Sequence, residues 1–329
     1  MCHKWSFYSG SVLDENDATV IVFADDNTPI FCHDDPSVLK TKLQDEADHI
    51  TNWFRKNKMV VSGDKTKLMV TGTHANRLYN LNETPMSLNV DGHEVTETAS
   101  EKLLGIVVNQ LGTWKNHLHG DDENLGLLKE LSKRIGILKK LRKYLPAARF
   151  KMLVNGIWNS KLQYGISVWG SVWGSNGKLL GLDQNSINIK KSDMKKLQVL
   201  QNSTLRIILK KKYDTPTTSL LSEAKVLSVN QLIAYNILVQ TFKIQMTQEP
   251  LYHYQRLFGR QLDAQNSTRS ISRQDSRIDF KLSQTRCSFF YTAANLWNLI
   301  TPGMRTIQTV ASFKTKAKQW VMSTIPAKI

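Results

Sequence analysis

The sequence predicts an α+β protein, in which an antiparallel sheet with one packed helix is followed by a mainly α-helical region. Two observations predict this class. Up to about residue 118, short β-branched or alternating runs are separated by turn residues, as in hairpins. From Asn124 onward, leucine and isoleucine recur at three- or four-residue spacing over long stretches, as on one face of a helix. The change in pattern indicates a sheet-rich part and a helical part.

The first predicted element is a hairpin. The β-branched run Thr19–Phe23 predicts a buried strand, and the polar corner that follows turns the chain into a second strand, Thr28–Cys32. The adjacent acids Asp25 and Asp26 therefore lie at the tip of the hairpin. Two carboxylates so close repel each other unless a cation shares them, and Mg²⁺ prefers hard oxygen ligands. The alternative is a solvated turn, because Asp is an ordinary turn residue.

The next elements complete the sheet-rich part. Asp35-Pro36 predicts a helix start, and apolar residues from Leu39 onward recur at helical spacing until about Asn57. Asp91-Gly92 between two alternating runs is a strong hairpin signal. Further strands are predicted at 59–61, 67–70, 86–90, 93–95 and 103–107, with a turn that contains Lys65 between the first two.

Helices dominate the rest of the chain. They are predicted at 127–145, where Pro146 ends the pattern, and at 150–169, 194–209, 227–246, 289–299 and 312–322. Residues 256–279 are polar and predict a loop. Trp158, Trp169 and Trp173 suit either base stacking or a core, and a core is preferred for Trp158. His117 and His119 are predicted in a loop without a metal site, since neither Cys nor acid completes a ligand pattern.

The chain is strongly basic, and the positive charge is clustered. It has 44 Lys and Arg against 28 Asp and Glu, a formal net charge of +16. A polyanion is therefore the expected partner. The helices at 127–145 and 194–209 are lined with cations, although a charged helix face can simply be solvated. The residues expected to contact phosphates are Lys133, Arg134, Lys139, Lys140, Arg142, Lys143, Lys210 and Lys211.

The sequence shows no pattern for a disulfide framework, a zinc ribbon, a membrane span or a secretion signal. The cysteines Cys2, Cys32 and Cys287 are widely spaced, so neither a disulfide framework nor a zinc ribbon is predicted. No apolar run reaches the roughly 20 residues of a membrane span, and no apolar signal segment follows Met1. We expect an intracellular protein, in the cytoplasm or the nucleus, without a membrane partner.

Several motifs follow one another in a characteristic order. They are Phe23-Ala24-Asp25-Asp26, a helix with Trp53 and Asn57 near its end, Asp64-Lys65-Thr66-Lys67, Lys102-Leu103-Leu104-Gly105-Ile106 and Trp114-Lys115-Asn116-His117. In this order they resemble the reverse transcriptases of non-LTR retrotransposons, of the jockey-like or LINE-like kind. The acidic box is similar to palm motif C, Lys65-Thr66 to the motif D turn, and Leu104-Gly105 to the primer grip.

The resemblance implies a domain organisation. Residues 19–118 correspond to a partial polymerase palm, 119–212 to a helical thumb-like region and 213–329 to a helical C-terminal region, with 1–18 unassigned. In the second half it is carried by segments such as Tyr164–Gly170 and Leu296–Asn298. The implied activity is RNA-directed DNA polymerisation, with an RNA template and a DNA primer or duplex as partners.

The resemblance also implies roles for three residues. Two Mg²⁺ ions would clamp the primer hydroxyl and the triphosphate, with Asp25 as the direct ligand and Asp26 as the accessory one. Lys65 would approach the leaving pyrophosphate, or it is a solvated turn lysine. Phe23 would lie beneath the primer end, or it belongs to the core.

The same resemblance leads us to expect no polymerisation by this chain alone. The fingers, and the palm motif that supplies a third metal-binding aspartate, are not recognised in residues 1–18. Two adjacent carboxylates offer Mg²⁺ only a weak site. The alternatives are a non-catalytic, basic remnant that binds RNA or DNA, and a transposon relic without a selected function.

Overall fold

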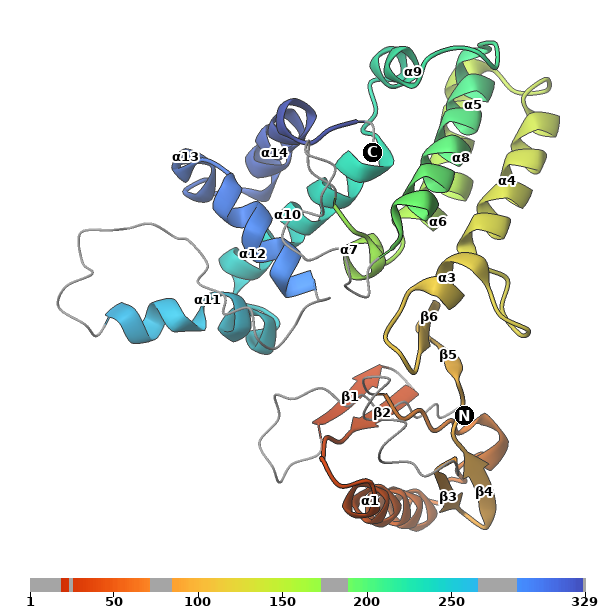
Figure 1. Ribbon diagram of the computed structural model, residues 1–329, viewed down its shortest axis with the longest axis vertical. Coiled ribbons are helices and arrows are strands. Elements are labelled where there is room, and N and C mark those ends of the chain that lie inside the picture. Colours follow the sequence, from red (N-terminus) through yellow and green to blue (C-terminus); the bar gives the residue numbers. More distant parts are fainter. Residues whose placement is uncertain (1–18, 24–25, 72–84, 173–188, 266–288, 328–329) are drawn as a thin grey trace. The chain divides into compact units, whose positions relative to one another are not determined.

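The computed structural model describes residues 19–23, 26–71, 85–172, 189–265 and 289–327 (Figure 1). For residues 19, 20, 22, 23, 26 and 259–265 it describes the backbone only. The chain divides into two compact units, Met1–Asn124 and Leu125–Ile329. The first unit combines hairpins with helices and the second is helical, so the predicted α+β class is confirmed.

The first unit begins with the predicted hairpin. Strand β1 (Thr19–Phe23) pairs antiparallel with β2 (Asp26–Ile30), and Phe23 lies opposite Asp26. The second strand therefore begins two residues earlier than predicted, at Asp26. Pro29 lies opposite Val20 in this pairing. In the described part of the chain the hairpin joins no further strand, so Pro29 lies in an edge strand, where proline is tolerated.

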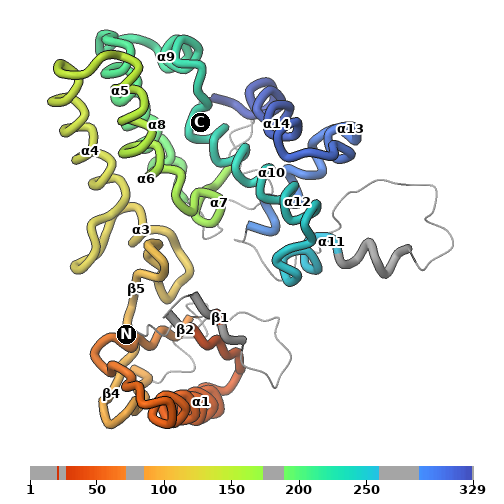
Figure 2. The backbone as a smooth tube through the Cα atoms, turned by 180° about the vertical axis from the view of Figure 1, so that it is seen from behind, coloured from red at the N-terminus to blue at the C-terminus, as the bar shows by residue number. Residues whose placement is uncertain are grey.

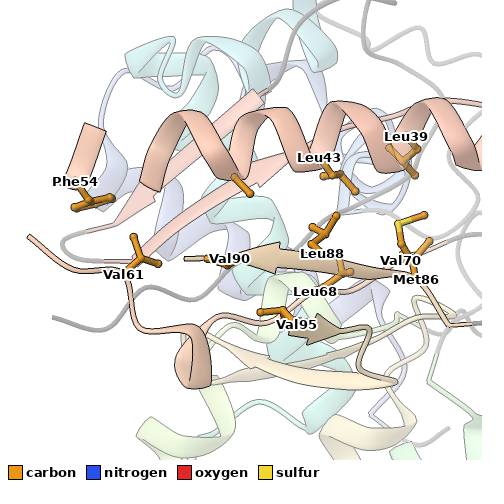
Figure 3. Packing of buried hydrophobic residues seen from close by; sticks show 11 residues of the cluster. Leu39, Leu43, Phe54, Val61, Leu68, Val70, Met86, Leu88, Val90 and Val95 are labelled. Carbon is orange, nitrogen blue, oxygen red and sulfur yellow. The ribbon is translucent and has the colours of Figure 1, made fainter. Parts of the chain in front are cut away.

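Helix α1 (Pro36–Lys56) confirms the predicted amphipathic helix. Asp35 caps its start, with Oδ1 accepting a hydrogen bond from the Ser37 backbone N–H at 2.8 Å. The apolar face of α1 packs on strand β3, and Leu39, Leu43 and Phe54 enter one hydrophobic cluster with Leu88 and Val90 (Figure 3). Hydrophobic contacts with Leu88 and Val90 of β3 therefore hold the helix in place.

Two of the predicted strands, 59–61 and 67–70, are wrong. Between them lies the 3₁₀ turn η1 (Gly63–Lys65), and of the flanking residues only Leu68 forms a β-bridge, with Glu97. Val61, Leu68 and Val70 are nevertheless buried in the core of this unit (Figure 3). The apolar pattern therefore marked burial, and burial does not require a strand ladder.

The remaining strands form two more hairpins. Strands β3 (Ser87–Val90) and β4 (His93–Thr96) flank Asp91-Gly92, as predicted, and both turn residues have positive φ. The predicted strand at 103–107 is wrong, because Leu104 (φ 46°) and Gly105 (φ 83°) form the turn between β5 (Ser100–Leu103) and β6 (Ile106–Asn109).

The sheet-rich part of the prediction holds only in part. The described strands form three separate two-stranded hairpins, whereas one antiparallel sheet was expected. Helix α3 (Lys115–His119) replaces the loop predicted around the histidines, and it packs on β6. His117 is buried there, within 3.4 Å of the Val107 backbone nitrogen. Its imidazole therefore belongs to the packing of α3 on β6.

The second unit begins with α4 (Leu127–Leu141), four residues shorter at its end than predicted. The predicted helix at 150–169 is interrupted. Helix α5 (Ala147–Val154) continues through a π-helical turn, η2 (Asn155–Asn159), into α6 (Ser160–Gln163). Gly165, with φ 59°, separates α6 from α7 (Ile166–Trp169).

Further helices complete the described part of this unit. They are α8 (Lys191–Leu209), α9 (Thr217–Ala224), α10 (Val229–Thr247), α11 (Leu251–Gln265), α12 (Phe289–Leu299), α13 (Pro302–Arg305) and α14 (Val310–Thr324). Helices α9 and α13 were not predicted. The loop predicted at 256–279 is wrong up to Gln265, and its remainder lies outside the described residues.

The core of the second unit centres on α10. Phe242 of α10 stacks on Phe313 of α14, with ring centroids 4.0 Å apart, and Trp297 of α12 lies 6.2 Å from Phe313. All three rings are fully buried. At the end of α12, the buried Arg305 donates hydrogen bonds to the backbone carbonyl groups of Trp297, Asn298 and Ile300 at 2.9–3.2 Å.

Candidate nucleic-acid interface

Two basic helices of the second unit end side by side. Helix α4 packs against α8, and both views show the two helices running in the same direction (Figures 1 and 2). Arg142, at the end of α4, donates from Nε to the Ile207 carbonyl of α8 at 3.2 Å. This hydrogen bond ties the last turn of one helix to the last turn of the other.

Exposed lysines surround these two helix ends. We call them the basic end, which consists of Lys139, Lys140, Lys143, Lys210, Lys211 and Lys212. The C-terminus of a helix carries a partial negative charge, so cations are stabilised at the C-terminal ends of both α4 and α8. Two acids lie close by in sequence or space: Asp214 is exposed, and Glu223 pairs with Lys211 at 3.0 Å. The surface therefore keeps a strong positive excess.

The predicted arginines are engaged within the protein. Arg142 also donates to the Leu145 carbonyl at 3.3 Å, and its guanidinium lies 5.1 Å from the centre of the Phe150 ring. Arg134 donates to the Ile157 carbonyl and lies 3.9 Å from Glu130. Through these contacts the two arginines stabilise the packing of the helices. Lys133, in contrast, is exposed along α4, so the lysines are the better candidates for phosphate contacts.

Two tyrosines at the basic end were not singled out from the sequence. Tyr144 has 71% of its surface exposed and Tyr213 has 87%. Lys143 Nζ lies 5.0 Å from the centre of the Tyr144 ring, and the Arg206 guanidinium lies 5.2 Å from that of Tyr213. The available signal was that each tyrosine directly follows a lysine, but sequence alone does not separate exposed rings from buried ones.

Trp158 and Trp169 do not contribute to this surface. Trp158 and Trp169 are fully buried, and Trp169 Nε1 donates to the Tyr164 carbonyl at 2.9 Å. The preference for a core position is therefore confirmed for Trp158, and base stacking is excluded for both. Trp173 lies outside the described residues.

The residues of the predicted polymerase centre lie in the first unit. Asp25 is outside the described residues, and for Asp26 the backbone alone is described, at the start of β2. Lys65 is exposed and ends the turn η1, as expected for a turn lysine. Within the described ranges, no three His, Cys, Asp or Glu side chains are grouped to hold a metal ion. The Mg²⁺ site at Asp25 and Asp26 stays a prediction.

The class that these observations define is an α+β protein with a helical unit that carries a basic end. Comparisons with protein-family models, with curated proteins and with solved structures found no match to this chain. Among the helices that are described, none combines the length and apolar character needed to cross a membrane.

Proposed function

We propose that this protein binds nucleic acid through the basic end of its helical unit. The observation that carries the proposal is that α4 and α8 end side by side, each with exposed lysines in or directly after its last turn. Because Arg142 ties the two helix ends together, these lysines are presented by a packed bundle. A fixed array of cations suits a backbone with regularly spaced phosphates.

Counterion release gives this proposal a quantitative form. Each lysine that neutralises a phosphate of a single strand contributes about 0.7 to the slope of log Kd against log salt, and about 0.9 on duplex DNA. If all the lysines of the basic end make contact, the slope for a single strand is about 4. A protein that is merely basic shows no dependence on these particular residues.

The experiment is a salt titration of Kd by fluorescence anisotropy with a labelled oligonucleotide. In one variant Lys139, Lys140 and Lys143 are replaced by Gln. The matched control carries the same change at three exposed lysines of α14, Lys314, Lys316 and Lys318. We expect the first variant to lower the slope by about 2 and the control to leave it nearly unchanged. Equal losses in both variants, or a flat dependence on salt, would contradict the proposal.

A narrower proposal rests on the resemblance to non-LTR reverse transcriptases. The order of the motifs supports it, as does the antiparallel hairpin in which Phe23 pairs with Asp26. Mg²⁺ is the implied cofactor, with Asp25 and Asp26 as its ligands and Lys65 near the leaving group. RNA template and DNA primer are the implied partners.

This narrower proposal is tested by primer extension. We expect no synthesis by this chain alone, since two adjacent carboxylates offer Mg²⁺ a weak site. Template-dependent synthesis that requires Mg²⁺ and is lost in Asp25→Ala would show an active polymerase. Binding at the basic end without synthesis fits the non-catalytic alternative.

A further inference from the structure

We infer that the nucleic acid bound at the basic end is single stranded, and that Tyr144 and Tyr213 stack on its unpaired bases. The inference rests on the proposed function, because the lysines supply the phosphate contacts. It adds the substrate class: a strand whose base faces are accessible.

The exposure of the two rings is the first observation. A tyrosine ring is largely apolar and is usually buried over much of its surface. Among the exposed aromatic side chains of the described ranges, Tyr213 and Tyr144 have the highest exposed fractions, 87% and 71%. A single exposed ring needs no explanation, but two at the same cluster of cations do.

The cation beside each ring is the second observation. Lys143 lies over Tyr144, and Arg206 lies over Tyr213. Arg206 also donates to the Thr215 carbonyl at 3.1 Å, which fixes the guanidinium on the loop that carries Tyr213. A cation on one face restrains the ring and leaves the opposite face for a base. Restraint before binding lowers the entropy that stacking costs.

The connection between the two rings is the third observation. Tyr144 lies two residues after Arg142, whose Nε bonds to the Ile207 carbonyl, and Ile207 is next to the Arg206 that holds Tyr213. Both rings therefore belong to the same helix ends. Each ring also follows a lysine of the basic end directly, so each helix end carries exposed cations and one aromatic ring.

The combination of exposed cations and exposed rings distinguishes single strands from duplexes. An unpaired strand offers phosphates to cations and base faces to rings, and stacking of this kind tolerates any base. In a duplex the base faces are covered by their neighbours, so the rings gain little. The lysines attract both forms, whereas the tyrosines favour only the single strand.

The test compares three probes of equal phosphate number: a single-stranded oligonucleotide, the same strand with abasic sites, and a duplex. The protein is the full chain, either wild type or with Tyr144→Leu and Tyr213→Leu. We expect the wild type to bind the single strand about 100-fold more tightly than the abasic strand, about tenfold for each ring. The double variant should lose this preference and keep its affinity for the duplex and its salt slope.

A second variant controls for chemistry. Tyr144→Phe with Tyr213→Phe keeps both rings and should retain the preference for the single strand. The test is carried out with RNA and with DNA strands of the same sequence. Stacking predicts that the Leu variant loses the same factor in affinity for both. Because both side chains are exposed, the variants should fold, and circular dichroism checks this.

The outcomes separate this inference from the function on which it rests. Two results overturn the role of the tyrosines and leave the nucleic-acid site intact. One is salt-dependent binding without a preference for unpaired bases, and the other is an equal loss of affinity for all probes in the Leu variant. Failure of the wild type to bind any probe overturns the nucleic-acid site itself.

Discussion

Arg305 is the residue whose removal we expect to damage the helical unit most clearly. The residue has 4% of its surface exposed, and its side chain donates hydrogen bonds to three backbone carbonyl groups around the end of α12. Trp297 and Asn298 lie in the last turn of α12, where side chains commonly donate to the carbonyl groups, and Ile300 directly follows the helix. In Arg305→Met the packing volume remains similar, but the donors are lost.

The magnitude follows from the accessibility of the three acceptors. Trp297 and Ile300 are buried, so their carbonyl groups do not recover a partner from water, whereas Asn298 is only half-buried. An unsatisfied buried acceptor costs about 1–3 kcal/mol, so two of them cost about 4 kcal/mol. For a domain of this size, that lowers Tm by about 10 °C.

Thermal unfolding followed by circular dichroism measures the effect, and hydrogen exchange of the α12 amides locates it. Arg305→Lys keeps the charge but not the planar fork, so its loss should be intermediate. Lys314→Met removes an exposed cation from the neighbouring α14 and should change Tm by little. The reasoning is refuted if Arg305→Met and Lys314→Met lower Tm equally.

Three further changes probe other parts of the chain. Leu43→Ala leaves a cavity under α1, where Leu43 is 1% exposed, and should lower the free energy of unfolding by about 2–5 kcal/mol in urea denaturation. Burial raises the pKa of the Asp121 carboxyl, but hydrogen bonds from Ser100 and Asn124 outweigh it, so the folded pKa lies below its usual value. The stabilisation by the ionised carboxylate is present above the unfolded pKa of about 3.9 and is lost as the pH falls through the folded pKa. Asp121→Asn should therefore make the free energy of unfolding depend less on pH in the acid range. Burial, and then the charge of Arg256, lowers the pKa of His253, so stability should fall as the pH drops below about 6.5, and melting curves of His253→Phe should lack this dependence.

Local signals predicted the elements that local contacts determine. The helix between Asp35 and Asn57 was predicted because its cap, its first-turn proline and its apolar face are all written in neighbouring residues. The hairpin at Asp91-Gly92 was predicted because positive φ at both turn residues suits that dipeptide. Leu104 adopts the same conformation without such a signal, so the turn it makes was missed.

Contacts between distant residues were beyond sequence reasoning. Arg142 was predicted as a phosphate ligand from its place in a run of cations, but it bonds to a carbonyl 65 residues away. Apolar residues at 59–61 and 67–70 were interpreted as strands, although burial alone explains Val61, Leu68, Met69 and Val70. The exposure of Tyr144 and Tyr213 depends on where α4 and α8 end, which a pattern of residue types does not specify.

The π-helical turn η2 allows buried side chains that recur every four residues to stay on one face of the helix. Phe150, Val154, Trp158 and Leu162 are all buried, and they recur every four residues. In a regular α-helix such residues drift by about 40° at each step, so they would leave the core. The wider turn at Asn155–Asn159 compensates for this drift. Removing one residue there, such as Gly156, would give a spacing that a regular helix supports. This turn is therefore a point at which the chain can be shortened by one residue while both flanking segments keep their faces in the core.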